Sequence, residues 1–207
     1  MGEKLNDHKG SITYRYSLCP NTIYLNITNR CTNNCIFCIK TYSSGLQGYR
    51  LTLDKEPTLQ RIWESIRKEV NKSDREIVWC GFGEPTIRLD IVLNLTKKIK
   101  KEYPLIKVRL NTDGLAQLRN KNMQVARELK DAGIDSVSIS LNTESSEKYE
   151  EICRPSTSKA YQAVLDFARD CRKYFSQVIL TVVRMEGIDI PQCEKIAANL
   201  GCDFRIR

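Results

Sequence analysis

Residues 22–38 read TIYLNITNRCTNNCIFC and decide most of what can be expected of this chain. The segment 22–28 alternates apolar and polar side chains, which predicts a short β-strand. Three cysteines follow at once, Cys31, Cys35 and Cys38, in the spacing Cys-x-x-x-Cys-x-x-Cys. Three thiolates can bind three irons of a [4Fe–4S] cluster and leave the fourth iron without a protein ligand. The spacing therefore predicts a [4Fe–4S] cluster with one open iron.

Two other interpretations of these cysteines stay open at this point. One is a structural zinc knuckle, and the other is a set of unrelated buried thiols. Zinc needs a fourth Cys or His near by, but the only histidine is His8, in a charged N-terminal stretch. A second cluster is not expected, because no ligand spacing joins the other six cysteines, which are Cys19, Cys80, Cys153, Cys171, Cys193 and Cys202.

Length and composition indicate one soluble, globular domain. The chain has 207 residues, of which 41% are hydrophobic and 28% charged. We expect an N-terminal extension over 1–20 and a single domain over 21–207. No apolar run approaches the ~20 residues needed to cross a bilayer, and the N-terminal sequence MGEKLNDHKG has no apolar signal core. These features predict a cytoplasmic protein without a membrane partner, whose nine cysteines serve as thiols and metal ligands.

The net charge of +8 raises the question of nucleic-acid binding. Four lysines, at 97, 98, 100 and 101, end a predicted helix, where cations oppose the negative end of the helix dipole. A solvated helix end explains this cluster, so a nucleic-acid partner is not expected.

Strand and helix patterns alternate along the chain. Strands are predicted near 22–28, 76–81, 105–112, 134–142, 177–184 and 203–207, and helices over 58–71, 89–103, 117–132, 158–173 and 190–200. Residues 41–57 form the one long irregular connection. Such alternation implies a parallel sheet with right-handed crossovers and helices outside. Because six strands are too few to close a barrel, we expect an open partial (β/α)6 barrel.

One face of several predicted strands is polar, although strands of a closed parallel barrel are usually apolar on both faces. In 134–142, for example, four polar residues alternate with Val137, Ile139 and Leu141. The polar face should therefore line a wet or ligand-filled lumen. Candidate substrate contacts in that lumen, each of which could equally make a buried structural hydrogen bond or ion pair, are Asn26, Lys107, Arg109 and Arg184.

Three further motifs follow predicted strands and should lie at the same rim as the cysteines, because sites in such folds gather at the carboxyl ends of the strands. The first is Gly81-Phe82-Gly83-Glu84-Pro85, a glycine-rich turn that ends in a carboxylate. The others are 111–114 (NTDG) and 140–142 (SLN). Each motif alone is as consistent with a turn or a helix cap. Their expected convergence with the cysteines favours a functional site.

Taken together, these motifs resemble the radical S-adenosylmethionine (SAM) superfamily over nearly the whole chain. The cysteine motif, with the aromatic Phe37 before its last cysteine, is similar to the superfamily signature. The turn 81–85 resembles the Gly-Gly-Glu-Pro element that binds the SAM amino group, with Phe82 where glycine is usual. The resemblance implies that the SAM contacts are Phe37, Gly81, Phe82, Gly83, Glu84, Thr112, Ser140 and Arg154, with Arg154 on the carboxylate.

More narrowly, the stretch YLNITNRCTNNCIFCIK resembles the TatD-associated radical SAM proteins, a subgroup that fixes no substrate. The superfamily resemblance implies two cofactors, a [4Fe–4S] cluster and SAM. The cluster would reductively cleave SAM to methionine and a 5′-deoxyadenosyl radical, which would abstract hydrogen from a small-molecule substrate. An electron donor such as flavodoxin or ferredoxin would reduce the cluster.

Two alternative functions remain open at the level of sequence. The chain could be an activase that installs a glycyl radical on a partner protein. It could also be an iron–sulfur electron carrier or sensor that never cleaves SAM, although such a protein would not need the glycine–glutamate turn beside an open iron.

Overall fold

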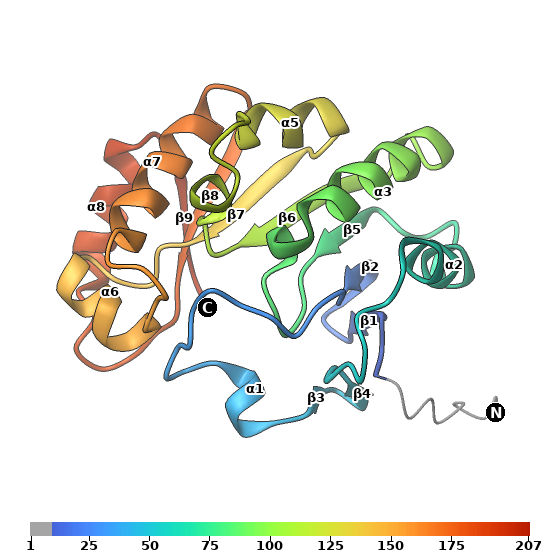
Figure 1. The fold of residues 1–207 in the computed structure, drawn as a ribbon, viewed down its shortest axis with the longest axis horizontal. Helices are drawn as coiled ribbons and strands as arrows, with labels where there is room; N and C mark the ends of the chain where they lie inside the picture. The colour runs from blue at the N-terminus through green and yellow to red at the C-terminus, as the bar shows by residue number, and fades with distance from the viewer. Residues whose placement is uncertain (1–9) are drawn as a thin grey trace.

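A single curved sheet of seven strands organises the protein, in the order β1-β2-β5-β6-β7-β8-β9 (Figure 1). The computed structural model describes residues 10–207, so residues 1–9, including His8, lie outside the described residues. Strand β1 runs antiparallel to β2, and every later pairing is parallel. The strands are β1 (Thr13–Tyr16), β2 (Cys19–Leu25), β5 (Glu76–Trp79), β6 (Lys107–Thr112), β7 (Ser136–Ser140), β8 (Gln177–Val182) and β9 (Asp203–Ile206).

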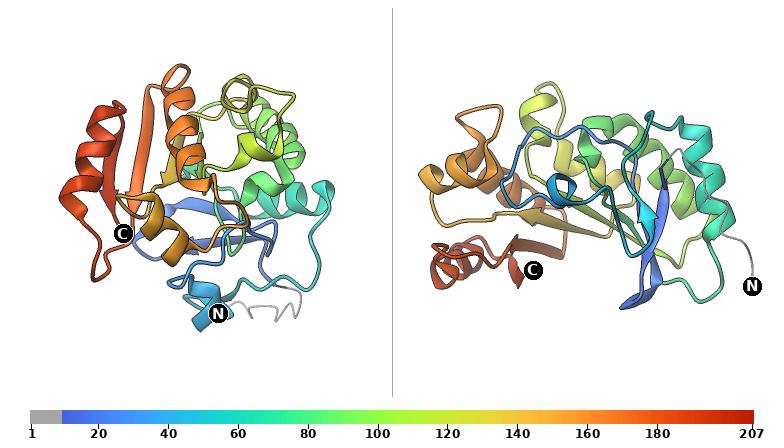
Figure 2. Two further views of the ribbon diagram at one scale, coloured as in Figure 1. Left: turned by 60° about the vertical axis from the view of Figure 1, so that its left-hand side comes forward. Right: turned by 90° about the horizontal axis from the view of Figure 1, so that it is seen from below.

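Helices follow the strands and lie along the outer side of the curved sheet (Figure 2). They are α2 (Leu59–Glu69), the 3-10 turn η1 (Pro85–Arg88), α3 (Leu89–Glu102), α4 (Ala116–Arg119), α5 (Val125–Ala132), α6 (Ser146–Cys153), α7 (Ala160–Arg172) and α8 (Ile190–Asn199). Between β2 and α2 the chain forms a short helix α1 (Ile39–Tyr42) and a small hairpin of β3 (Gly45–Leu46) and β4 (Tyr49–Arg50).

The main core lies between the sheet and the outer helices. Alternate strand residues such as Ile23, Ile77 and Val108 are fully buried there against α2, α3 and α5. Trp79 is also buried, and its indole N–H donates to Thr96 Oγ1 of α3 over 2.9 Å, which satisfies its one polar group. Apolar burial on this face fixes the register of each strand, because a shift by one residue would turn the apolar set away from the helices.

The inner face of the sheet carries different side chains near β1 than across β6 and β7. Tyr14, Tyr24, Val78 and Phe82 form a smaller cluster of buried residues at the β1 side. Across β6 and β7 the same face presents Arg109, Asn111 and a row of serines. The predicted polar lumen face is therefore present, but its part nearest β1 is aromatic.

The expected open, partial barrel is confirmed, because β1 and β9 are the two edges of a sheet that does not close. All six predicted strands are present; five are shorter than predicted, and β2 has the predicted length but begins and ends three residues earlier than 22–28. The sequence patterns did not predict β1, which lies within the expected N-terminal extension, or the hairpin β3–β4, which lies within the connection 41–57.

The predicted helix 117–132 is wrong in one respect, because the structure divides it into α4 and α5. Asn120 ends α4, and its side-chain amide donates to the carbonyl of Ala116 over 2.8 Å. The Gln117 amide then donates to the carbonyl of Met123 over 2.8 Å and so holds the intervening loop. Local side-chain bonds of this kind compete with helical hydrogen bonds.

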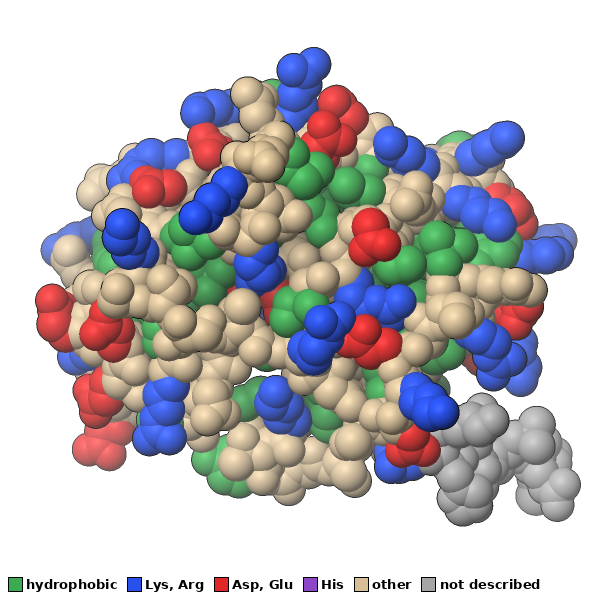
Figure 3. Space-filling view, viewed as in Figure 1, with side chains coloured by type: hydrophobic (Ala, Val, Ile, Leu, Met, Phe, Trp, Pro, Cys, Tyr) green, Lys and Arg blue, Asp and Glu red, His purple; other side chains and the backbone are tan. Residues whose placement is uncertain are grey.

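The surface seen in Figure 3 mixes both signs of charge, with Lys and Arg interspersed among Asp and Glu. A hollow separates the lobe that contains α1 from the body of the molecule in the same view (Figure 3). Among the described residues, no helix has the length and apolar character required to span a bilayer.

Candidate cluster and cofactor site

The cysteine loop, defined here as residues 29–38, leaves the carboxyl end of β2 and runs along the end of α6 (Figure 1). Three backbone bonds fix it there: Asn34 N–H and Ile36 N–H donate to the carbonyls of Cys153 and Ile152, each over 2.9 Å, and Ser156 N–H donates to the carbonyl of Thr32 over 2.9 Å. Asn33 also forms an antiparallel bridge with Pro155. The end of α6 therefore acts as a template for this loop.

Cys31, Cys35 and Cys38 are partly accessible, and all nine cysteines of the chain are free thiols. Cys38 N–H donates to the carbonyl of Cys35 over 3.1 Å, which makes a tight turn between the last two. Within residues 10–207, no group of three or more His, Cys, Asp or Glu side chains is already gathered as a metal site. The donor set still fits an iron–sulfur cluster, since three free thiols lie on one loop at the sheet edge where such sites form.

The local environment favours the protonated thiols of Cys31 and Cys35 in the metal-free chain. Burial, and secondarily the charge of Asp113, raises the pKa of Cys31 to about 12. A hydrogen bond with Cys153, and then burial, raises the pKa of Cys35. Iron must therefore displace protons when it binds, so cluster assembly is coupled to proton release.

The two glycines of the turn 81–85 permit a close approach to the segment that precedes the cysteines. A Cβ built on Gly83 would lie 2.4 Å from the carbonyl oxygens of Thr28 and Arg30, and one on Gly81 would lie 2.2 Å from Asn26 Oδ1. Only glycine fits at these positions without moving the backbone. The turn is thereby fixed to the cysteine loop, and Glu84 N–H adds a bond to the carbonyl of Arg30 over 2.8 Å.

Glu84 is fully enclosed, and its carboxylate accepts four hydrogen bonds. Oε1 accepts from Thr86 N–H at 2.9 Å, Thr86 Oγ1 at 2.6 Å and Thr112 Oγ1 at 2.9 Å, while Oε2 accepts from Asp113 N–H at 2.6 Å. Burial, and then the Asp113 charge, raises the pKa of Glu84 to about 7, although these bonds oppose the shift. The side chain ties the turn after β5 to the end of β6.

Arg119 of α4 extends this network to the cysteine loop. Its guanidinium donates to Thr86 Oγ1 over 2.5 Å and to Thr32 Oγ1 over 3.0 Å, and it lies 4.0 Å from Asp113 Oδ2. Thr32 in turn donates to Asp113 Oδ2. Arg119 thus joins the cysteine loop to the buried Asp113 directly, and to the buried Glu84 through Thr86.

Two buried side-chain atoms lack a hydrogen-bond partner within residues 10–207, namely Asn33 Oδ1 and Arg119 Nε. Asn33 belongs to the cysteine loop, and Arg119 contacts it through Thr32. Buried polar atoms are almost always paired, so an unpaired one indicates a missing water, ion or ligand. Both such atoms lie at the predicted cluster site.

The other predicted SAM contacts are distributed around this rim. Thr112 is buried, and its hydroxyl donates to Glu84. Phe37 is partly buried and packs against the main core. Ser140 ends β7 and accepts a bond from Arg207 over 3.2 Å. Phe82 is buried in the aromatic cluster, and Arg154 has an exposed side chain just after α6. Its backbone adopts φ 45°, in the left-handed region that terminates a helix.

The four predicted substrate contacts do not form one group. Asn26 is buried and occupied: its amide donates to the carbonyls of Ser11 and Leu51, and its oxygen accepts from Phe82 N–H. Arg109 makes a bidentate pair with Glu76, at 2.9 Å and 3.0 Å. Lys107, at the start of β6, and Arg184, after β8, are exposed.

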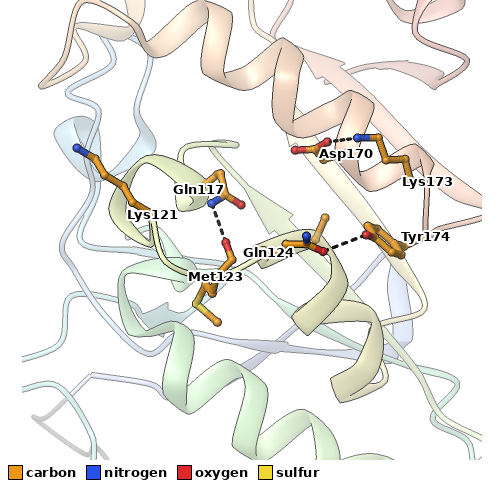
Figure 4. A pocket seen from close by; sticks show the side chains of 8 residues that line it. Gln117, Lys121, Met123, Gln124, Asp170, Lys173 and Tyr174 are labelled. Atoms are coloured by element: carbon orange, nitrogen blue, oxygen red, sulfur yellow. Dashed lines mark hydrogen bonds and ion pairs between the residues drawn. The ribbon is translucent and has the colours of Figure 1, made fainter.

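A surface pocket lies apart from these residues, between the α4–α5 loop and α7 (Figure 4). Figure 4 shows its polar side chains bonded to one another, as in the ion pair of Lys173 with Asp170 at 2.7 Å. It includes none of the predicted site residues, and its lining is Gln117, Lys121, Met123, Gln124, Ala126, Asp170, Lys173 and Tyr174.

The sequence motifs did not identify several residues of the site. Arg119 lay inside a predicted helix, where no spacing distinguished it from a surface cation. Cys153 was named only among the six cysteines without ligand spacing, because its contact with the cysteine loop is made across more than a hundred residues. Thr32 lies within the cysteine motif and Thr86 directly follows the turn 81–85, and the sequence contains no signal for their roles.

A profile of the radical SAM superfamily matches residues 25–198. Among curated proteins, a probable GTP 3′,8-cyclase of Thermococcus kodakarensis is 29% identical over 165 residues, 80% of this chain and 48% of the relative. A GTP 3′,8-cyclase of Peptoclostridium acidaminophilum is 30% identical over 193 residues, 93% of this chain and 55% of the relative. The chain thus spans about half the length of the curated relatives that it matches.

Solved structures share the fold at low identity. A Streptococcus suis SuiB structure with bound SAM aligns with TM-score 0.66 and 18% identity, over 88% of this chain and 39% of that one. Methylornithine synthase aligns with TM-score 0.64 and 14% identity, over 90% of this chain and 52% of that one.

Proposed function

Because the chain belongs to the radical SAM superfamily, we propose that it binds a [4Fe–4S] cluster through Cys31, Cys35 and Cys38 and uses SAM to abstract hydrogen from a small molecule. The observation that supports this most directly is the position of the unpaired Asn33 Oδ1 and Arg119 Nε, both at the cysteine loop. When bound, the cluster and SAM supply the reductive C–S cleavage and the hydrogen-abstracting radical.

The protein's own residues fix where these groups bind. Glu84 joins the turn after β5 to the end of β6, and Arg119 joins both to Thr32 in the cysteine loop. The turn 81–85 then presents its backbone beside the cysteines for the SAM amino group. In this proposal the Glu84 carboxylate supports the turn, since its bonds are made within the protein, and contributes to SAM binding chiefly by its charge.

Arg154 is the proposed partner of the SAM carboxylate. Asn34 of the cysteine loop donates to the Arg154 carbonyl over 3.2 Å, so the two segments are in contact. The Arg154 side chain is exposed beside this loop, and a planar guanidinium can bind a carboxylate in a bidentate manner. Thr112 and Ser140, at the ends of β6 and β7, are proposed to contact the remainder of SAM.

For the substrate, we propose a purine nucleotide, with GTP as the first compound to test. The relatives' names specify GTP, and the inner sheet face offers hydrogen-bonding groups at Asn111, Ser138 and Ser140. Arg207 adds a guanidinium bonded to Ser140 and Thr181. This surface is better suited to a small polar molecule than to the glycyl loop of a partner protein or to an electron carrier without substrate.

The experiment uses the full chain, reconstituted with iron and sulfide without oxygen and reduced with dithionite as a substitute for flavodoxin or ferredoxin. SAM is added with GTP deuterated at C3′, with ATP as control, and 5′-deoxyadenosine is analysed by mass spectrometry. Deuterium in 5′-deoxyadenosine supports both radical SAM activity and GTP as the substrate. Unlabelled 5′-deoxyadenosine at a rate unchanged by GTP would reject GTP alone, and no SAM cleavage would reject radical SAM activity. The narrower TatD-associated resemblance stays a prediction.

A further inference from the structure

Cys153 lies beside the proposed cluster ligand Cys35 although more than a hundred residues separate them in sequence. The backbone bonds of Asn34 and Ile36 to the carbonyls of Cys153 and Ile152, each 2.9 Å, enclose Cys35 between two paired positions. The two side chains therefore lie on facing segments, and they interact with each other. The juxtaposition is therefore fixed by backbone geometry.

The surroundings of Cys153 hold its sulfur in place. The thiol is fully buried at the end of α6, and the Asn142 side-chain amide donates to Sγ over 3.3 Å. Asn142 itself has φ 64° and is buried, a strained conformation that the surrounding structure maintains. Next to it, Asn33 donates to Tyr149 Oη over 2.9 Å, so the cysteine loop and α6 share a second buried contact.

Cys35 has three possible thiol partners in the metal-free chain. Cys31 and Cys38 lie on its own loop, whereas Cys153 is the partner that the α6 backbone holds against it. Cys38 follows Cys35 across a turn of the same loop, in which Cys38 N–H donates to the Cys35 carbonyl. The pair 35–153 is thus already in contact before any change in the loop.

We propose that Cys35 and Cys153 form a reversible disulfide when the cluster is absent, with a hydroperoxide as the oxidant. The Cys35 sulfur is the more accessible of the two, and after losing its proton it would attack ROOH, break the O–O bond and give a sulfenic acid and ROH. The Cys153 sulfur then attacks that sulfenic sulfur, forming the S–S bond and releasing water. In sum, two thiols and one hydroperoxide give one disulfide, one alcohol and one water.

This disulfide would protect a cluster ligand during oxidative loss of iron. A sulfenic acid without a nearby thiol proceeds to sulfinic and sulfonic acids, which are not reduced by ordinary thiols. A disulfide is reduced by thiol exchange and returns Cys35 to iron binding. Only this consequence rests on the proposed function, because disulfide formation itself needs no iron and no SAM.

The test uses the full chain purified without iron, treated with hydrogen peroxide and digested with trypsin under non-reducing conditions. Residues 31–40 and 149–159 fall on separate tryptic peptides, so a 35–153 disulfide joins two peptides, whereas a 35–38 disulfide stays within one. We expect the joined pair as the main product, located at Cys35 rather than Cys31 or Cys38 by tandem mass spectrometry and removed by dithiothreitol. The variant Cys153→Ser should lose it and show several-fold more sulfinic and sulfonic acid at Cys35.

The matched control is Cys193→Ser, which changes another buried thiol, in α8, and should leave the joined peptides at wild-type yield. A dominant 35–38 disulfide, or equal overoxidation of Cys35 with and without Cys153, would overturn the proposal. Circular dichroism of both variants verifies folding. If the full chain fails to bind iron but still gives the joined peptides, that result would count against the cluster assignment and would leave the disulfide proposal standing.

Discussion

At the scale of single residues, the structure shows that the most conspicuous polar groups of the sequence are bonded within the protein. Arg109 and Asn26 were candidate substrate contacts that could equally make structural bonds; in the structure Arg109 is paired with Glu76, and Asn26 bridges three backbone groups. Sequence alternation can predict which face a side chain occupies, because strand side chains alternate. It cannot predict what a side chain bonds to, since that partner comes from a different segment.

Glu84 gives a pH-dependent prediction. Its pKa is raised from 4.5 to about 7 in the folded chain, so folding favours the protonated form. The resulting stabilisation is complete below pH 4.5 and is lost as pH rises through 7, a difference of roughly 3 kcal/mol. Urea unfolding of the iron-free chain should show the free energy of unfolding falling by about this amount between about pH 5 and 8.

The variant Glu84→Gln should flatten that decline, while Glu150→Gln, at an exposed position of α6, should leave it unchanged. An equal decline in all three proteins would assign the titration to another group.

Arg154 gives a second prediction at this scale. Arg154→Ala should weaken SAM binding by roughly tenfold or more without loss of iron, because a carboxylate then loses a charged partner. Arg154→Lys should recover part of the affinity, since an ammonium lacks the planar fork of guanidinium. Calorimetric titration of reconstituted protein measures both. Full affinity in the alanine variant would place the SAM carboxylate elsewhere.

At the scale of elements, alternating periodicity predicted the six parallel strands and most of the helices. It missed β1, β3 and β4, whose short lengths and partly exposed residues give little periodicity. The division of α4 from α5 depends on the side chains of Gln117 and Asn120, which a helical pattern does not distinguish from surface residues. The cysteine motif itself was predictable, but its attachment to α6 depends on tertiary packing.

The turn 81–85 gives a prediction at the level of elements. Gly83→Ala places a methyl group 2.4 Å from two backbone carbonyl oxygens, so β5 and the cysteine loop must separate. We expect a loss of about 2–3 kcal/mol in unfolding free energy, together with reduced iron loading.

The control Gly187→Ala has free space around its Cβ but a φ of 80°, so it should cost only about 1 kcal/mol and keep full iron content. Denaturant titration and iron analysis of both variants test this. Normal iron loading in Gly83→Ala would show that the close packing of this turn is not needed for cluster binding.

At the scale of the whole molecule, the fold and the superfamily could be predicted from one sequence because a single short motif coincided with regular strand–helix alternation. The substrate could not, since the lumen face is built from single residues of several strands. The chain spans about half the length of the two curated relatives described above, so the GTP proposal concerns the part of them that it spans.

The separation of core and site gives a prediction for the molecule as a whole. The main core lies between sheet and helices, and Cys31 and Cys38 are not among its buried residues. Loss of iron should therefore leave global unfolding nearly unchanged and raise hydrogen exchange only locally, in residues 29–38 and 149–156. Exchange that increases across β6 and β7 would show that the cluster stabilises the sheet.

The central claim is that Cys31, Cys35 and Cys38 bind a cluster whose open iron binds SAM. Electron paramagnetic resonance of the anaerobically reduced protein, recorded with and without SAM, tests it most directly. The account predicts about four irons per chain, a cluster signal that shifts when SAM is added, and loss of that signal in the triple alanine variant but not in Cys193→Ser. A full cluster signal in the triple variant, or a wild-type signal that saturating SAM leaves unchanged, would contradict it.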